Sequence, residues 1–115
     1  MMWEGINRRK FPRANYPCKV IVLAGGLKET FSTHTENIGI GGICVVLSRE
    51  LPKFFPVRTI LYLKDGEGLL ECSGRIVWSI KTDVDFDTGI EFLDIREADI
   101  VRIEKIIQEC LRKRI

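Results

Sequence analysis

The segment 69–80 alternates between two sets of side chains, and this alternation constrains the fold more than any other feature of the sequence. One set is mixed in character and consists of Leu69, Glu71, Ser73, Arg75, Val77 and Ser79. The other set is mostly apolar and consists of Leu70, Cys72, Gly74, Ile76, Trp78 and Ile80. Successive side chains of a β-strand point to opposite faces of a sheet. A period of two therefore predicts a long strand with one face toward a core.

Five further segments are predicted to be strands, at residues 19–24, 27–35, 43–47, 57–64 and 89–93. The Gly25–Gly26 pair separates the first two of them and is typical of a hairpin. Parallel neighbours would need crossover connections of a dozen or more residues, and the connections between these segments are shorter. We therefore expect the strands to be antiparallel.

The period of the sequence changes after residue 93, and a helix is predicted over residues 94–114. Asp94 followed by Glu97 has the spacing of a capping box, which marks the start of a helix. Apolar residues then recur at helical intervals, at Ile100, Val101, Ile103, Ile106, Ile107, Cys110 and Leu111. These elements predict a mainly β protein. It is either a six-stranded antiparallel barrel or a strongly curled sheet, with one C-terminal amphipathic α-helix packed on it.

The composition indicates one domain over residues 1–115. A hydrophobic fraction of 45% in 115 residues is enough to fill a single core. Eighteen Lys and Arg residues against sixteen Asp and Glu residues give a net charge of only +2. Such a balance lacks the overall positive field of a non-specific nucleic-acid binder. Any basic function is therefore expected to be local.

The cysteines give no sign of a metal site. They stand at positions 18, 44, 72 and 110 without a C-x-x-C pair, and His34 is the one histidine. Cysteines within apolar runs behave as small core residues, and free thiols suit a reducing compartment. The apolar runs are far shorter than the ~20 residues that span a bilayer, and the N-terminus has no apolar signal-peptide core. We therefore expect a soluble, cytoplasmic protein that does not act on a membrane.

Two short motifs point to a binding function. Arg8, Arg9 and Arg13 lie on a segment that Pro12 stiffens. Guanidinium groups pair with phosphate oxygens or with the edge of guanine through two parallel hydrogen bonds. The second motif offers a side-chain amide followed by glycines that let a ligand approach the backbone, and it reads Asn37-Ile38-Gly39-Ile40-Gly41-Gly42. The two motifs together predict a site for an anion and a nucleobase.

The order of these features resembles the PilZ domain family, over nearly the whole chain. The family has an RxxxR motif near the N-terminus, matched by Arg9 to Arg13, and a [D/N]xSxxG motif, matched by Asn37 to Gly42 except that Gly39 replaces serine. The segments 74–78 and 89–92 are also similar to later strands of the family. The resemblance implies a six-stranded barrel that binds the bacterial second messenger cyclic di-GMP, without a cofactor or metal and without enzyme activity.

The resemblance also implies a role for each residue of the two motifs. Arg9 and Arg13 would be the principal contacts to phosphate or guanine, and Arg8 an auxiliary one. Asn37 would read a guanine edge, and Gly42 would permit close approach of the backbone. Gly39 lacks the hydroxyl of the family's serine and should weaken binding. The implied ligand-binding set is Arg8, Arg9, Arg13, Asn37, Gly39 and Gly42.

The resemblance further implies a division of the chain and a mode of action. Residues 1–16 would form an N-terminal arm that is mobile until the ligand bridges it to the Asn37 turn. Residues 17–93 would form the barrel, and residues 94–114 the helix. Ordering of the arm would change a surface offered to an unidentified protein partner in motility, secretion or exopolysaccharide control. The protein would act as a monomer or a homodimer.

Two other functions remain open at this stage. A PilZ-like domain with Gly39 could have lost the messenger and act only as a protein-interaction adaptor. A small barrel could also bind single-stranded nucleic acid, for which Arg58, Tyr62 and Lys64 are the candidate residues. The glycines of the second motif also fit a bend in a barrel strand. Trp78 fits either a packing position in the core or a place at the rim of the barrel where it could stack against a base.

Overall fold

Six antiparallel strands and one long helix make up the computed structural model, which describes residues 13–113. The elements are β1 (Lys19–Ala24), η1 (Gly25–Leu27, a short 3-10 helix), β2 (Glu29–Gly39), β3 (Gly42–Leu47), β4 (Pro56–Leu61), β5 (Leu70–Lys81), β6 (Phe86–Phe92) and α2 (Glu97–Arg112). The expectation of a mainly β protein with one C-terminal amphipathic helix is confirmed.

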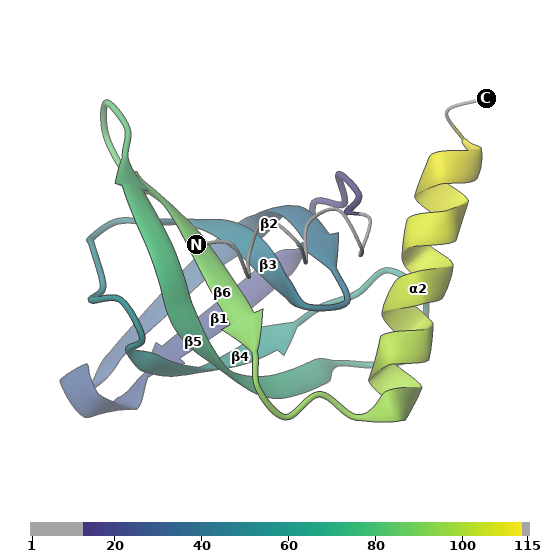
Figure 1. The fold of residues 1–115 in the computed structure, drawn as a ribbon, viewed down its shortest axis with the longest axis horizontal. Coiled ribbons are helices and arrows are strands. Elements are labelled where there is room, and N and C mark those ends of the chain that lie inside the picture. Colours follow the sequence, from purple (N-terminus) through teal and green to yellow (C-terminus); the bar gives the residue numbers. More distant parts are fainter. Residues whose placement is uncertain (1–12, 114–115) are drawn as a thin grey trace.

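The strands close into a barrel in the order β1-β2-β3-β6-β5-β4 (Figure 1). Hairpins join β1 to β2, β2 to β3, β4 to β5 and β5 to β6. The pairs β3–β6 and β1–β4 complete the closure. Closure leaves the barrel without a continuous exposed sheet edge. The sequence was compatible with either a barrel or a curled sheet, and the structure shows a closed barrel.

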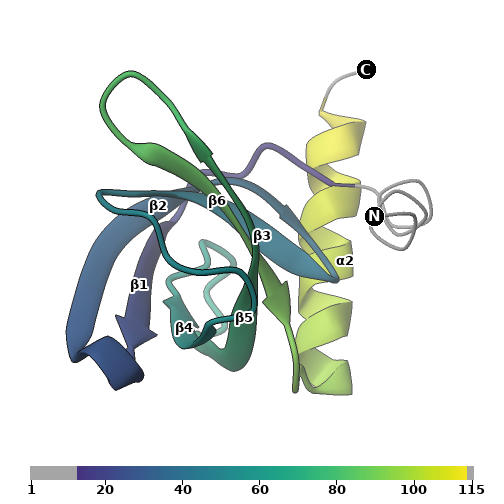
Figure 2. The same cartoon turned by 60° about the vertical axis from the view of Figure 1, so that its left-hand side comes forward.

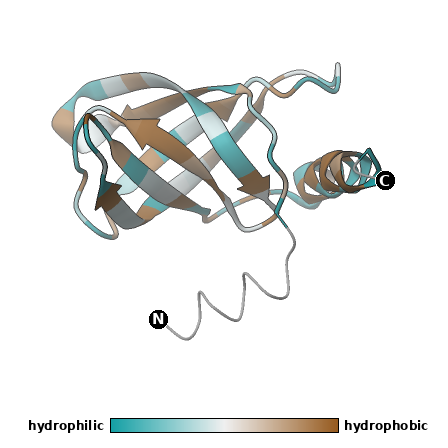
Figure 3. Cartoon of the chain, turned by 90° about the horizontal axis from the view of Figure 1, so that it is seen from above, coloured by the Kyte–Doolittle hydropathy of each residue, from teal (hydrophilic) through white to brown (hydrophobic). Residues whose placement is uncertain are grey.

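The core fills the barrel with inward-facing apolar residues from all six strands. The fully buried ones include Val20, Val22, Ile43, Val45, Leu61, Leu70, Ile76 and Ile90. Burial of such a side chain contributes about 1.5–3 kcal/mol to folding. Helix α2 lies beside the barrel and is seen almost end-on in Figure 3. It adds Ile103, Ile106 and Ile107 to the same core.

Several strand bounds differ from those predicted. β2 continues to Gly39 instead of ending near residue 35, because Asn37, Ile38 and Gly39 pair with the first three residues of β3. β6 begins at Phe86 rather than Gly89, because its first residues pair with both β3 and β5. β4 ends at Leu61 instead of Lys64. Local sequence patterns do not determine these strand ends, because pairing with strands that are distant in the sequence decides where a strand begins and ends.

The predicted helix start was wrong. Helix α2 begins at Glu97, with Arg96 in the N-cap position and no side-chain cap. Asp94 accepts a hydrogen bond from the backbone N–H of Ser73 at 2.8 Å instead. The carboxylate therefore ties the segment before the helix to β5, and this bond lowers the pKa of Asp94.

An ion pair fastens the helix to the loop between β4 and β5. Arg102 donates to both carboxylate oxygens of Asp65, at 3.0 and 2.8 Å, and to the carbonyl of Gly68 at 2.9 Å. Hydrogen bonding to Arg102 lowers the pKa of Asp65. Figure 2 shows the helix upright along one side of the barrel. No helix in residues 13–113 has the length and apolar character needed to cross a membrane.

Two irregularities in strand pairing reshape one outer face of the barrel. The register between β2 and β3 shifts between Thr35 and Asn37, and the register between β5 and β6 shifts between Ile76 and Trp78. Each shift is a β-bulge, which re-aims the side chains beside it. The bulge at Val77 ends the predicted alternation of β5, so Ile80 is 59% exposed rather than buried.

Candidate functional site

Arg13 contacts both ends of the second motif. Its Nε donates to Oδ1 of Asn37 at 2.7 Å, and its Nη2 donates to the carbonyl oxygen of Gly42 at 3.3 Å. Arg13 is exposed, whereas Asn37 is half-buried. The two motifs that the sequence singled out therefore meet in space, although 24 residues separate Arg13 from Asn37.

A short backbone bridge fixes the position of Arg13. Ala14 pairs with Ile38 through two hydrogen bonds of 2.9 Å, one in each direction. Ala14 is 4% exposed and belongs to the core. The bridge pairs one residue of the N-terminal segment with the last part of β2. It thereby places Arg13, the residue before Ala14, beside Asn37. The packing of Ala14 in the core thus positions Arg13.

The second motif is mostly strand rather than turn. Asn37 to Gly39 end β2, Gly42 opens β3, and only Ile40 and Gly41 form the turn. A Cβ on Gly42 would lie 2.1 Å from the carbonyl oxygen of Ile90 on β6. Glycine is therefore required at position 42 by the packing of the barrel itself. The sequence also allowed these glycines to mark a bend in a barrel strand; at Gly42 the structure instead shows a close approach of β6 to β3.

A row of four residues runs across the outer face next to Arg13. Asn37 pairs with Cys44, Cys44 with Gly89, and Gly89 with Trp78, so the row crosses β2, β3, β6 and β5. The two bulges immediately precede Asn37 and Trp78. The bulged face therefore carries an amide at one end and an indole at the other.

Trp78 lies over Gly89 and not in the core. A Cβ on Gly89 would lie 2.3 Å from the indole Nε1 of Trp78, so the ring rests on the glycine. Trp78 is half-buried and stands outside the core cluster. The interpretation of Trp78 as a core residue was wrong, because the bulge at Val77 turns the indole to the outside.

Cys44 forms the floor of this face. Its side chain is 6% exposed, and its Sγ lies 3.3 Å from Oε1 of Glu36. Burial raises the pKa of the Cys44 thiol to about 12, with Glu36 and Asp87 adding to the rise. The thiol is therefore neutral near pH 7 and acts as a small apolar surface beneath the site.

The structure describes four of the six predicted site residues. Two hydrogen bonds bring Arg13, Asn37 and Gly42 together. Gly39 is buried at the end of β2 and pairs with Gly42. Arg8 and Arg9 lie outside the described residues. Cys44 was not predicted as part of the site. Its place opposite Asn37 follows from the register between β2 and β3, which the sequence alone does not give.

The N-terminal segment after Arg13 is attached at several points. The backbone N–H of Lys64 donates to the hydroxyl of Tyr16 at 2.6 Å. Thr35 donates through its hydroxyl to the carbonyl of Tyr16, and Cys110 Sγ lies 3.9 Å from the carbonyl oxygen of Asn15. Residues 15–16 therefore contact β2, the β4–β5 loop and helix α2.

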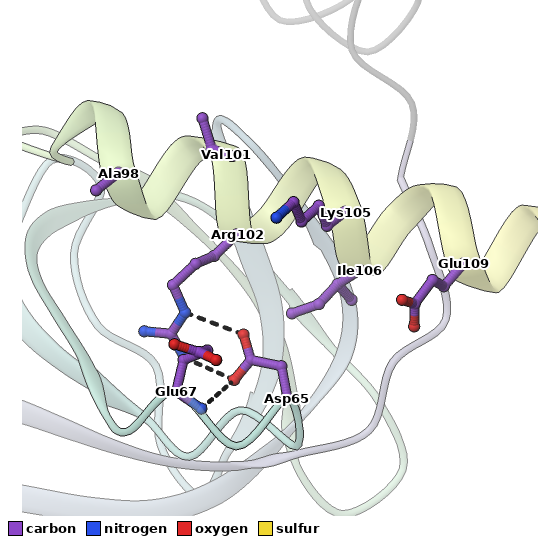
Figure 4. Close-up of a pocket in the computed structure, with 8 residues that line it drawn as sticks. All are labelled: Asp65, Glu67, Ala98, Val101, Arg102, Lys105, Ile106 and Glu109. Carbon is purple, nitrogen blue, oxygen red and sulfur yellow. Dashed lines mark hydrogen bonds and ion pairs between the residues drawn. The ribbon is translucent and has the colours of Figure 1, made fainter.

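A separate pocket of about 530 Å³ lies between α2 and the β4–β5 loop (Figure 4). Its lining residues are Asp65, Glu67, Ala98, Val101, Arg102, Lys105, Ile106 and Glu109. Of the predicted ligand-binding residues that the structure describes, which are Arg13, Asn37, Gly39 and Gly42, none lines it. Figure 4 shows Arg102 reaching from the helix to Asp65 on the loop, to which two hydrogen bonds join it.

Comparison with solved structures finds the same fold in several bacterial proteins. Bacillus subtilis inhibitor of motility (MotI/DgrA) has a TM-score of 0.76 and 22% identity, over 93% of this chain and 51% of that one. Escherichia coli YcgR, solved in complex with c-di-GMP, has a TM-score of 0.76 and 15% identity, over 92% of this chain and 47% of that one. The chain thus spans about half the length of these two proteins.

A third structure matches over almost its full length. The PilZ domain of E. coli YcgR with c-di-GMP has a TM-score of 0.72 and 14% identity, over 92% of this chain and 93% of that one. No curated protein matches the chain significantly. The family model of the PilZ domain matches residues 7–111. The chain therefore belongs to the PilZ domain family.

Proposed function

We propose that this protein is a non-enzymatic receptor for cyclic di-GMP. The observation that supports it most directly is the contact of Arg13 with Asn37 and Gly42, which unites the two motifs on one face. The PilZ domain of YcgR, which has the same fold, was solved with this ligand. The proposed binding set is Arg8, Arg9, Arg13, Asn37, Gly39 and Gly42.

The chemistry of this face suits a nucleotide that has both phosphates and guanines. The guanidinium of Arg13 can pair with phosphate oxygens or with O6 and N7 of guanine. Asn37 offers an amide acceptor and an amide donor, which can complement the edge of a guanine. The indole of Trp78 rests on Gly89 next to the small side chain of Cys44, and an indole on an outer face can stack against a base.

The absence of the motif serine at Gly39 bears on affinity and not on the mode of binding. A neutral hydroxyl hydrogen bond contributes about 0.5–1.5 kcal/mol, which corresponds to about tenfold in affinity at the upper end. Its loss therefore weakens binding without abolishing it. The remaining contacts of Arg13 and Asn37 are charge-assisted or bidentate and contribute more.

Binding would be transmitted through the segment that follows Arg13. Asn15 and Tyr16 contact helix α2 and the β4–β5 loop, through Cys110 and Lys64. A ligand that draws the residues before Arg13 onto the outer face would therefore act on the surface formed by α2 and this loop. Ordering of the arm on binding is the switching step that we propose.

The output would be recognition of another protein. An unidentified partner in motility, secretion or exopolysaccharide control fits such a switch, and the similar B. subtilis protein is described as an inhibitor of motility. Free, mostly buried cysteines suit a reducing compartment, so we propose a cytoplasmic location. The receptor would act as a monomer or a homodimer.

A second candidate is an adaptor that binds no messenger, and Gly39 is the observation that favours it. The third, a single-stranded nucleic-acid binder, has weaker support. Arg58 contacts Ser73 and Glu71, Lys19 lies over the ring of Tyr62, and Lys64 lies over the ring of Tyr16. Arg58, Tyr62 and Lys64 are exposed and are already engaged with neighbouring side chains on the surface of the barrel.

Calorimetric titration of the purified chain with cyclic di-GMP tests the proposal. We expect a dissociation constant in the micromolar range or below, no binding of GTP, and a loss of at least about tenfold in Arg13→Ala. A folded wild-type protein that takes up no cyclic di-GMP would favour the adaptor. Affinity for oligonucleotides that falls steeply with salt would favour the nucleic-acid binder.

A further inference from the structure

A second arginine lies on the same outer face, held from two sides. Nε of Arg75 donates to Oε1 of Glu91 at 2.7 Å, and the guanidinium carbon lies 5.0 Å from the centre of the Phe54 ring. Glu91 thus fixes one edge of the guanidinium, and Phe54 fixes one face of it. Rigid presentation of this kind lowers the entropy cost of binding a ligand.

The free edge of this guanidinium is available to a ligand. The side chain of Arg75 is 41% exposed. Within residues 13–113, its terminal nitrogens Nη1 and Nη2 make no hydrogen bond. These two nitrogens form the fork that pairs with phosphate oxygens or with the Hoogsteen edge of guanine.

The register places Arg75 next to the candidate site. Gly42, whose carbonyl accepts from Arg13, pairs with Glu91, and Glu91 pairs with Arg75. Neighbouring strands lie about 4.8 Å apart, so two steps separate the backbones of Gly42 and Arg75 by about 10 Å. The two arginines therefore stand on either side of the bulged face.

The backbone of Phe54 adopts a sterically strained, left-handed conformation. Its φ is +69°, in the left-handed region that bulky residues rarely adopt, and its side chain is 52% exposed. Its N–H donates to the carbonyl of Ile76 at 2.6 Å, beside the bulge of β5. Strained, exposed residues of this kind concentrate at functional sites. Lys53 also lies 5.2 Å from the ring centre and adds positive charge.

We propose that Arg75, held by Glu91 and Phe54, is a further ligand-binding residue that contacts the half of the dinucleotide remote from Arg13. The proposal rests on the proposed function. Arg13 would hold one nucleotide over the β2–β3 hairpin, and Arg75 would hold a phosphate or guanine of the other. Phe54 is a positioning residue in this arrangement, because it orients the guanidinium.

Titration of four variants with cyclic di-GMP tests this proposal. Arg75→Gln should bind at least about tenfold more weakly than wild type, because it loses the fork and its charge. Arg75→Lys should also bind more weakly, because an ammonium is a point charge. Phe54→Leu should bind about threefold more weakly, through the freed guanidinium. The matched control is Arg58→Gln, whose arginine is 50% exposed on the neighbouring β4 and should leave affinity unchanged.

A direct readout separates contact from a structural effect. The Nε–H resonance of Arg75, assigned by its absence from Arg75→Gln, should shift when ligand is added to the wild type. The double variant Arg75→Gln/Glu91→Gln avoids an unpaired carboxylate and should unfold near the wild-type temperature while still binding weakly.

The outcomes are distinct. Wild-type affinity in Arg75→Gln, with an unshifted Arg75 resonance, would overturn this inference and leave the receptor function intact. Failure of the wild type to bind cyclic di-GMP would overturn the receptor function and this inference together.

Discussion

Nε of Arg13 lies 2.7 Å from Oδ1 of Asn37, and this hydrogen bond joins the N-terminal segment to the end of β2. With Asn37 reading a guanine edge as proposed, Asn37→Ala should weaken cyclic di-GMP binding by about tenfold, since a bidentate contact to a base edge is worth about 1–3 kcal/mol. The exposed contact should add little to folding stability. Titration calorimetry and thermal unfolding measure the two effects, with the exposed Asn15→Ala as the control. Equal losses in both variants would contradict a specific role for Asn37.

Restoring the family's serine should strengthen binding. Gly39 has no left-handed φ, so its backbone accepts an L-residue. Gly39→Ser should bind cyclic di-GMP about three- to tenfold more tightly than wild type, because it supplies one hydroxyl hydrogen bond. Gly39→Ala reduces chain flexibility equally but has no hydroxyl, so it separates the two effects. If serine gave no more affinity than alanine, the hydroxyl would have no part in binding here.

The two neighbouring glycines of the second motif should differ in their tolerance of alanine. A Cβ at Gly42 would lie 2.1 Å from the carbonyl of Ile90, whereas nothing lies within 4 Å of a Cβ at Gly41. Gly42→Ala should lower the free energy of unfolding by about 3 kcal/mol or more, or prevent folding. Gly41→Ala should change it by less than about 1 kcal/mol. Urea unfolding of both variants makes the comparison, and similar stability of the two would contradict the packing role.

The fold was largely predictable because β5 and helix α2 have strong periods of their own. Burial patterns such as that of Leu70, Cys72 and Ile76 follow directly from alternation. The bulge at Val77 could not be predicted in this way, because it lies in the pairing of β5 with β6, and beside it Ile76 also pairs with Phe54 from a distant loop. Local sequence carries no signal for such a contact.

The candidate site was predictable only in part. The sequence order of the two motifs pointed to Arg13 and Asn37, and a hydrogen bond joins them. Cys44 and Arg75 gave no signal, because their neighbours on the outer face come from other strands. The register of a closed barrel brings such residues together, and single-sequence patterns do not contain it.

The ion pair between Asp65 and Arg102 should make stability depend on acid pH. Arg102 lowers the pKa of Asp65 below its ordinary value of 3.8, so the folded state favours the ionised carboxylate. This contribution is fully present above pH 3.8 and is lost as pH falls through the lower folded pKa. The pair is partly buried, so Asp65→Asn should cost about 1–3 kcal/mol at pH 7, and the difference from wild type should shrink below pH 4. Urea unfolding at several pH values, with the exposed Glu67→Gln as control, tests this. A difference independent of pH would contradict the pairing.

The buried thiol of Cys44 should be inert near neutral pH and should lower stability in strong base. Burial raises its pKa to about 12 from an ordinary 9.0, so the folded state disfavours the thiolate. The unfolded chain ionises first, and the stabilising contribution is lost as pH rises from 9 toward 12. At pH 8 an alkylating reagent should label the half-buried Cys110 before Cys44, because the thiolate is the nucleophile and access is also needed. Mass spectrometry of the native and urea-unfolded protein gives the order of labelling. Rapid labelling of native Cys44 would mean that the outer face opens over it, and the site would then lack the closed floor described above.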